Sequence, residues 1–524
     1  MARISGSIGR RPLLGAAAAS APAGPAVSQG AAANTLRFVP HANLSSLDPL
    51  WSSALISTNY ALMVHDFLYG LGADLLPRPQ MVEEHELSAN GLTWTFRLRE
   101  GLWFHDGEPV RAADCLASIR RWSQRDVFGK RVASQTADMR VLDDRRFEIR
   151  LTKPFPLMPF ALTQAVILPE RVARTDAFTQ VTESIGSGPF RFVRDEWVAG
   201  SRAVFRKFER YVPRHEPPEA WAGGKVVHLE RVEWQVMPDA ATAVAALQQG
   251  EVDWMERPLL DLVPRLRRMR DVTVEVVERL GFYGFITFNT RVPPFDNPAL
   301  RRALVPAVDQ QEFMQALAGG DTELTKTGFG WFHPESPYAN DEGLATLIGQ
   351  RNLELARKLV RESGYDGRPV VQMLPTDLPA PNAIGLVANA LLRGIGLNVD
   401  LQAMDWGTMV GRWRASGEGA DRNPWHCFAL SWSGLWTTNP GMHTPLYGND
   451  HPNPRMEALR GAWFDAPDLD AQKQVARRMQ ALALEEPPFI PVGLWIIPHA
   501  WRASRVSGIL RAPSTVFWNV RKTA

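Results

Sequence analysis

The chain has 524 residues, 45% hydrophobic and 22% charged, which is the composition of a globular protein and excludes a disordered one. Lys and Arg number 58 against 56 Asp and Glu, and the two signs alternate along the chain, which argues against a nucleic-acid groove. At about 100 to 200 residues per domain, this length predicts two to four structural units.

The first 33 residues differ from the rest of the chain. They begin with a basic stretch that includes Arg10-Arg11, continue with a weakly apolar run and end in three alanines at 31–33. This pattern is typical of a twin-arginine export signal, which we expect to be cleaved after Ala33. Neither this run nor any later stretch reaches the roughly 18 apolar residues of a membrane span. We therefore expect an exported, periplasmic protein that does not span the membrane; a disordered tail with a chance arginine pair is the alternative.

The residues after the signal predict a strand, a turn and a helix. Residues 34–40 (NTLRFVP) alternate between apolar and polar side chains, as in a strand. A turn at Asp48-Pro49 leads into a helix that we expect to end at Gly70 and Gly72.

Residues 92–122 predict two strands followed by a helix. Residues 92–98 alternate strictly, and Asp106-Gly107 has the chemistry of a turn that leads into the second strand. In the helix at 112–122, Cys115 shares an apolar face with Ile119 and Trp122, so it is expected to be a core residue. Cys427 is the only other cysteine, which excludes a disulfide scaffold.

Two further helices carry recognisable start and stop signals. Asp239 is expected to cap a helix that ends at Gly250, and Asn352 a helix that ends at Gly364. In the second of these helices, Leu355, Ala356 and Leu359 are expected to face inward. Because each such helix is followed by an alternating strand, the chain predicts mixed α/β layers.

The search for catalytic chemistry finds no motif of a serine hydrolase, a nucleotide-binding loop or a zinc hydrolase. His105, Asp106 and Glu108 lie close in sequence, but adjacent side chains in one turn seldom converge on an ion. The 11 histidines show no paired spacing. We therefore expect no enzyme activity, no metal and no cofactor; an exported hydrolase of unrecognised type is the alternative.

The loop FALSWSGLWTTNPG at 428–441 has the composition of a binding surface. Trp432 and Trp436 lie four residues apart and offer flat apolar walls, and Ser433, Thr437 and Asn439 offer neutral hydrogen-bonding groups. The alternative is that Trp436 only packs within its own lobe.

Several segments, taken in order, resemble family 5 of the bacterial extracellular solute-binding proteins, the peptide-, dipeptide- and nickel-binding type that serves ABC importers. They are LTWTFRLREGLWFHDGEPVRAADCLASIRRW, GSGPFRF at 186–192, MPDAATAVAALQQGEVDW, FNTRVPPFDNPALRRALVPAVDQ at 288–310 and LALEEPPFIPVG. The resemblance implies an α/β, bilobal class II fold, in which a hinge joins two mixed-sheet lobes and the first lobe carries an extra subdomain. The implied division is 34–70, 186–282 and 490–524 for the first lobe, 71–185 for the subdomain and 283–489 for the second lobe.

The same resemblance implies a periplasmic receptor, with no catalysis, that closes around a small organic solute, a peptide or peptide-like molecule. It would act as a monomer and deliver this ligand to the permease and ATPase of an importer. A haem or metal-chelate receptor on the same fold is the alternative.

The resemblance also implies where the ligand lies. Peptide-binding members place a carboxylate for the ligand's ammonium group in the loop that matches 428–441, but this chain has no Asp or Glu from Cys427 to Tyr447. We therefore expect a ligand without a free ammonium group here, or an amine held by Asp405 beside Trp406. Other positions expected to border the cleft, or to lie near the crossing between the lobes, are Ser57, Thr58, Asn59 and Tyr60, and Phe288, Asn289 and Thr290.

Overall fold

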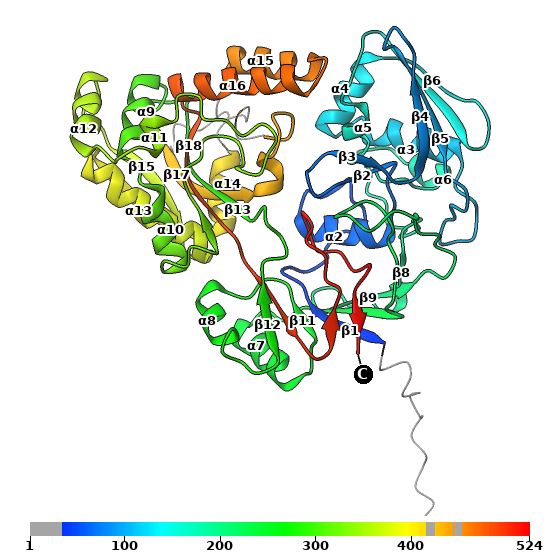
Figure 1. Ribbon diagram of the computed structural model, residues 1–524. Coiled ribbons are helices and arrows are strands. Elements are labelled where there is room, and N and C mark those ends of the chain that lie inside the picture. The colour runs from blue at the N-terminus through cyan, green and yellow to red at the C-terminus, as the bar shows by residue number, and fades with distance from the viewer. Residues whose placement is uncertain (1–33, 416–424, 444–445, 447–452, 524) are drawn as a thin grey trace, which may run out of the picture.

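The computed structural model describes residues 34–415, 425–443, 446 and 453–523. Figure 1 shows two lobes side by side, with a further α/β unit above the first lobe. The predicted export signal at 1–33 lies outside the described residues. No helix among the described residues is long and apolar enough to cross a membrane.

The first lobe is built on a seven-stranded mixed sheet in the order β12-β19-β11-β1-β10-β9-β8. β1 runs parallel to both β10 and β11, whereas the outer strands pair antiparallel. The strands are β1 (Thr35–Val39), β8 (Phe190–Phe192), β9 (Arg202–Lys207), β10 (Arg231–Gln235), β11 (Trp254–Met255), β12 (Val272–Glu275) and β19 (His499–Arg502). The helices are α2 (Leu55–Val64), α7 (Ala240–Gln249) and α8 (Val263–Leu266), with short 3-10 turns η1 (Arg194–Glu196) and η2 (Leu260–Leu262).

The subdomain has a four-stranded antiparallel sheet in the order β4-β5-β7-β6. Its strands are β4 (Val82–Leu87), β5 (Thr93–Leu98), β6 (Thr136–Val141) and β7 (Arg146–Leu151), and its helices are α3 (Ala112–Trp122), α4 (Val127–Gln135), α5 (Met158–Ala161) and α6 (Glu170–Ala173). A small antiparallel pair, β2 (Tyr69–Leu71) and β3 (Pro77–Pro79), lies between this sheet and the first lobe.

The second lobe is built on a six-stranded mixed sheet in the order β14-β18-β13-β17-β15-β16. The strands are β13 (Phe282–Phe288), β14 (Thr325–Lys326), β15 (Val370–Pro375), β16 (Val399–Met404), β17 (Cys427–Ser433) and β18 (Phe489–Trp495). The helices are α9 (Pro298–Leu304), α10 (Gln310–Ala318), α11 (Ala345–Ile348), α12 (Leu353–Glu362), α13 (Pro379–Gly394), α14 (Trp406–Arg414), α15 (Pro454–Asp465) and α16 (Leu469–Glu485), with 3-10 turns η3 (Val305–Ala307) and η5 (Gly434–Thr437). The last pair, β20 (Val506–Ser507) and β21 (Arg521–Lys522), returns to the first lobe, where Lys522 Nζ donates to the carbonyl of Thr35 at 2.6 Å.

The chain crosses between the two sheets twice, at residues 276–281 and again at 496–498. The second crossing corrects the expected division, which placed residues 490–524 in the first lobe. Phe489–Trp495 instead pairs along β13, because its side chains complete the buried sheet of the second lobe. The other expected boundaries remain predictions.

Several local signals are confirmed. α3 occupies the expected residues 112–122, and Cys115 is fully buried. Asp239 accepts from the backbone of Thr242, Asn352 accepts from that of Leu355, and Gly250 has the left-handed conformation of a helix end.

Three local predictions are wrong. The first helix ends at Val64, and Gly70 lies in β2, where a side chain would collide with the backbone of Trp221. Leu355 is 39% exposed, because α12 packs through Ala356, as expected, and through Val360 in place of Leu355. The turn at Asp106-Gly107 leads to one isolated bridge and not to a second strand.

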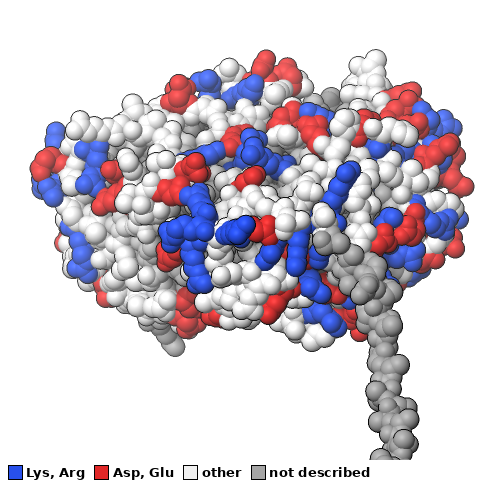
Figure 2. Space-filling view, turned by 60° about the horizontal axis from the view of Figure 1, so that its bottom comes forward, with Lys and Arg blue, Asp and Glu red and all other residues white. Residues whose placement is uncertain are grey.

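Charged side chains of both signs are interspersed over the face shown in Figure 2, although a few basic ones gather near its middle.

Candidate ligand-binding site

A cavity of about 320 Å³ lies where the first lobe, the subdomain and the second lobe meet. The first lobe contributes residues 49–53 and the start of α2, and the subdomain contributes the end of α3 and the turn into α4. The second lobe contributes Leu435 and Trp436 from η5. A ligand in this cavity would contact all three units at once.

Tryptophans form much of the cavity wall. Trp51, Trp122, Trp221 and Trp436 come from all three units and supply flat apolar surface. Trp51 is 40% exposed, which is unusual for so large an apolar side chain. Such a wall suits an apolar or planar part of a ligand.

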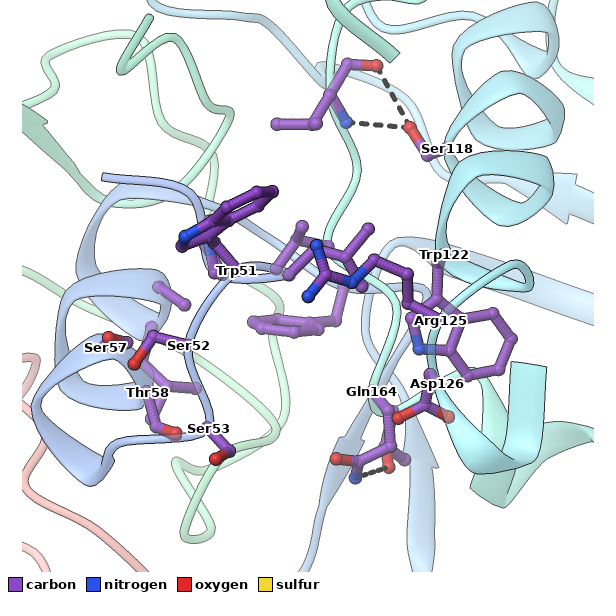
Figure 3. Close-up of a pocket in the computed structure, with 18 of the residues that line it drawn as sticks. Trp51, Ser52, Ser53, Ser57, Thr58, Ser118, Trp122, Arg125, Asp126 and Gln164 are labelled. Carbon is purple, nitrogen blue, oxygen red and sulfur yellow. Dashed lines mark hydrogen bonds between the residues drawn. The ribbon is translucent and has the colours of Figure 1, made fainter. Parts of the chain in front are cut away.

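Polar groups lie on two sides of the cavity. Figure 3 shows Asp126 and Gln164 close together on the subdomain side and Ser52, Ser53 and Thr58 on the side of the first lobe, with Arg125 reaching between them toward Trp51. Asp126 caps α4, since one carboxylate oxygen accepts from the backbone N–H groups of Phe128 and Gly129. Burial raises the pKa of Asp126, although these backbone hydrogen bonds oppose the shift.

The loop at 49–53 is held in place by a buried ion pair. Arg121, on the last turn of α3, donates to Asp48 at 2.8 Å, and the two side chains are only 3% and 1% exposed. Asp48 also accepts from the backbone of Leu50 and of Val181. These contacts fix the chain on either side of Pro49 and hence the position of Trp51.

Three of the residues predicted from the sequence, Ser57, Thr58 and Trp436, line the cavity. Ser57 and Thr58 do so from α2 and Trp436 from η5. The two residues that follow Thr58 point elsewhere, because successive helical side chains are about 100° apart. Asn59 donates to the buried carboxylate of Glu256 at 2.6 Å, and Tyr60 packs edge-on against Phe192.

The remaining predicted residues of the second lobe serve its internal structure. Trp432 and Ser433 end β17, where they pair with Tyr283 and Phe282. Asn439 is 2% exposed and accepts from the backbone of Met442. None of these three lines the cavity, and their ligand role stays a prediction.

Asn289 and Trp406 lie elsewhere in the second lobe. Asn289 follows the end of β13 that is farthest from the crossing at 276–281, and it donates to the carbonyl of Trp425 at 3.2 Å. The expectation that residues 288–290 lie near the crossing is therefore wrong, because β13 extends for about 3.3 Å per residue away from it. Trp406 begins α14 and donates its backbone N–H to Asp377, whereas Asp405 caps the same helix.

Sequence reasoning missed Trp51, Trp122, Arg125, Asp126 and Gln164, which all line the cavity. Trp51 could have been noticed as an aromatic residue in a Ser- and Pro-containing loop. The other four carried no local signal, since each occurs in an ordinary helical or turn sequence.

The described residues contain no group of three or more His, Cys, Asp or Glu that could hold a metal ion. Burial raises the pKa of both cysteine thiols, so these thiols stay protonated.

Comparison with known proteins decides the family. The sequence model of bacterial extracellular solute-binding proteins, family 5 (middle), matches residues 77–454. The chain belongs to this family. A probable peptide ABC transporter periplasmic-binding protein, y4tO of Sinorhizobium fredii, is 36% identical over 92% of each chain. The glutathione-binding protein GsiB of Salmonella typhi is 24% identical over 87% of this chain and 91% of its own.

Solved structures share the fold at lower identity. The dipeptide-binding protein from Pseudoalteromonas sp. SM9913, in complex with Met-Leu, superposes with a TM-score of 0.74 at 21% sequence identity, covering 93% of this chain and 100% of its own. The family 5 protein described here therefore has the expected bilobal α/β fold, with mixed sheets in both lobes.

Proposed function

We propose that this family 5 protein is the substrate-binding receptor of an ABC importer and that it captures a peptide or peptide-like solute in the cavity. The observation that carries the proposal is the composition of the cavity wall, since all three units contribute to it. A ligand that contacts both lobes favours the closed form, and that form is the one an importer can recognise. The names of the relatives support a peptide-like ligand.

Contacts between α15 of the second lobe and the subdomain, which we call the mouth contact, support closure as the working motion. Phe128 of α4 packs edge-on against Phe464 of α15, with ring centroids 5.3 Å apart. Asp465, next in the chain, pairs with Arg131 and with Lys153 of the subdomain, the latter at 2.9 Å. Figure 1 shows α15 reaching toward α4. Because Asp126, which caps α4, lines the cavity, the same helix connects the cavity wall to this contact.

The ligand is identified most directly from the protein itself. Protein purified from the periplasm of its own host is denatured, and the released material is analysed by mass spectrometry. A series of short peptides, or one peptide-like compound, recovered chemically unchanged would support the receptor. A bound chromophore or metal would replace the peptide assignment by that of a chelate receptor, and steady conversion of the compound would contradict a role without catalysis.

We further propose that the protein is exported by the twin-arginine route, as Arg10-Arg11 and the alanines at 31–33 suggest. Replacing both arginines by lysine should retain the full-length chain in the cytoplasm. Normal export of this variant would contradict the proposed route without affecting the receptor.

A further inference from the structure

The two arginines of the cavity wall differ in whether a carboxylate neutralises them. Arg121 is neutralised by its buried ion pair with Asp48. Arg125, one turn further along the chain, donates to the backbone carbonyl of Ala177 at 3.2 Å, and no carboxylate of the described residues forms an ion pair with it. Arg125 is therefore a cationic side chain of the cavity wall that has no carboxylate partner among the described residues.

Arg125 is held in place by aromatic rings. Its guanidinium carbon lies 4.7 Å from the ring centroid of Trp51 and 5.7 Å from that of Phe178. These contacts restrict the side chain and remove part of its hydration. A guanidinium has five N–H donors in a planar fork that matches a carboxylate, and the described residues of the protein accept from only one of those of Arg125.

The acidic group in the cavity wall is less suited to hold a cation. One oxygen of Asp126 is occupied by two backbone N–H groups, and burial raises the pKa of this carboxyl. It can accept from an N–H or O–H group of a ligand. The second-lobe loop adds neutral side chains, as its sequence from Cys427 to Tyr447 contains no acid.

We infer that Arg125 binds a carboxylate of the ligand and that the protein selects acids, including peptides without a free amino group, over their uncharged derivatives. This inference rests on the proposed receptor function and specifies the ligand class of the same cavity. The carboxylate would lie against the guanidinium beside Trp51, the apolar part would contact Trp122 and Trp436, and a donor of the ligand would face Asp126.

Four small compounds test the inference by changing one charge at a time. They are leucyl-leucine, its amide, N-acetyl-leucyl-leucine and the amide of the latter. Binding is measured by calorimetry to the wild-type protein, to Arg125→Gln and to the control Arg120→Gln. Arg120 is an exposed arginine of α3, five residues before Arg125 and outside the cavity wall, that donates to the carbonyl of Met139.

In the wild type, each acid should bind about 10- to 100-fold more tightly than its amide, as expected for a charge-assisted hydrogen bond. Acetylation of the amine should change the affinity by no more than about threefold. Arg125→Gln should abolish the preference for the acid while the amides still bind, and Arg120→Gln should retain it.

Equal binding of acids and amides by the wild type, or an unchanged preference in Arg125→Gln, would overturn the inference and leave the receptor function standing. If the wild type binds none of the four compounds, the peptide-like part of the proposed function fails. The inference is then decided by the material released from protein purified from its host. An acidic compound present in the wild type and missing from Arg125→Gln supports it, whereas a compound without an acidic group, or an empty protein, contradicts it.

Discussion

The two sides of the cavity use their polar side chains differently. In the second-lobe loop, Thr437 donates to Gly434, Thr438 donates to Leu435, and Asn439 closes a turn onto Met442. On the subdomain side, Arg125 and Asp126 keep part of their hydrogen-bonding capacity facing the cavity. The loop thus positions Trp436, whereas the subdomain supplies the charged groups. The polar composition of the second-lobe loop therefore did not show whether its side chains face a ligand or form hydrogen bonds within the loop.

The largest expected effect concerns the buried ion pair between Arg121 and Asp48, which holds the first-lobe loop at 49–53. Replacing Asp48 by Ala leaves Arg121 charged and buried without a partner, which should lower the free energy of unfolding by about 3 to 5 kcal/mol. Urea denaturation measures this loss. Glu183→Ala, which breaks the exposed pair with Arg171, should change the stability by less than about 1 kcal/mol. Similar losses in both variants would show that the buried pair does not hold the loop.

Within the second-lobe loop, the two tryptophans should behave differently. Trp436→Ala should weaken ligand binding by about 2 kcal/mol, because this side chain forms part of the cavity wall. Trp432→Ala should leave affinity within about threefold and act mainly on stability, since this residue pairs with Tyr283 in the sheet. Calorimetry with the natural ligand compares them; equal losses of affinity would place Trp432 in the site as well.

Buried histidines of the second lobe and Asp126 of the cavity wall should respond to pH with opposite signs. Burial lowers the pKa of His333 and of His443 to about 4, so both are neutral in the folded second lobe. The contribution of these two histidines to the free energy of unfolding is complete above their unfolded-state pKa of about 6.5. It is lost as the pH falls toward 4. The raised pKa of Asp126 acts the other way, because the folded state then binds the proton more tightly and gains stability as the pH falls.

This difference can be measured by urea denaturation at several pH values. The wild type should lose stability between pH 6.5 and 4, within a window set by the histidines. Asp126→Asn keeps a residue that can cap α4 but removes the titration. The stability of the wild type relative to this variant should fall as the pH rises above the ordinary pKa of an aspartate. If the difference in stability between the wild type and Asp126→Asn stayed constant over these pH values, the raised pKa of Asp126 would be contradicted.

The smallest expected effect concerns the mouth contact between α15 and the subdomain. Asp465→Asn removes the ion pairs with Arg131 and Lys153, which are partly exposed, and should weaken ligand binding about two- to fivefold. The effect should diminish at high salt. Asp138→Asn, which affects an exposed pair with Arg150 inside the subdomain, is the matched control and should not change affinity. Equal effects of both substitutions would mean that the mouth contact plays no part in closure.

Much of the local structure could be predicted from the sequence. The helix at 112–122, the caps at Asp239 and Asn352 and the left-handed Gly250 follow from side chains within a few residues of each other. The end of the first helix could not, because Gly70 is required by the distant backbone of Trp221. The inward face of α12 was predicted only in part, since Ala356 is buried as expected but Leu355 is exposed and Val360 is buried instead.

The candidate site shows the same division between local and distant information. The sequence by itself determined the family and the α/β layers, because ordered motifs and periodicity are properties of contiguous segments; it also predicted Thr58 and Trp436, which line the candidate cavity. Only the tertiary structure decided that Trp51, Arg125 and Trp436 surround one cavity and that Trp432, Asn289 and Asn439 serve the second lobe. The physical reason is that a cleft is made by segments about 75 to 380 residues apart, whose approach depends on how the whole chain packs.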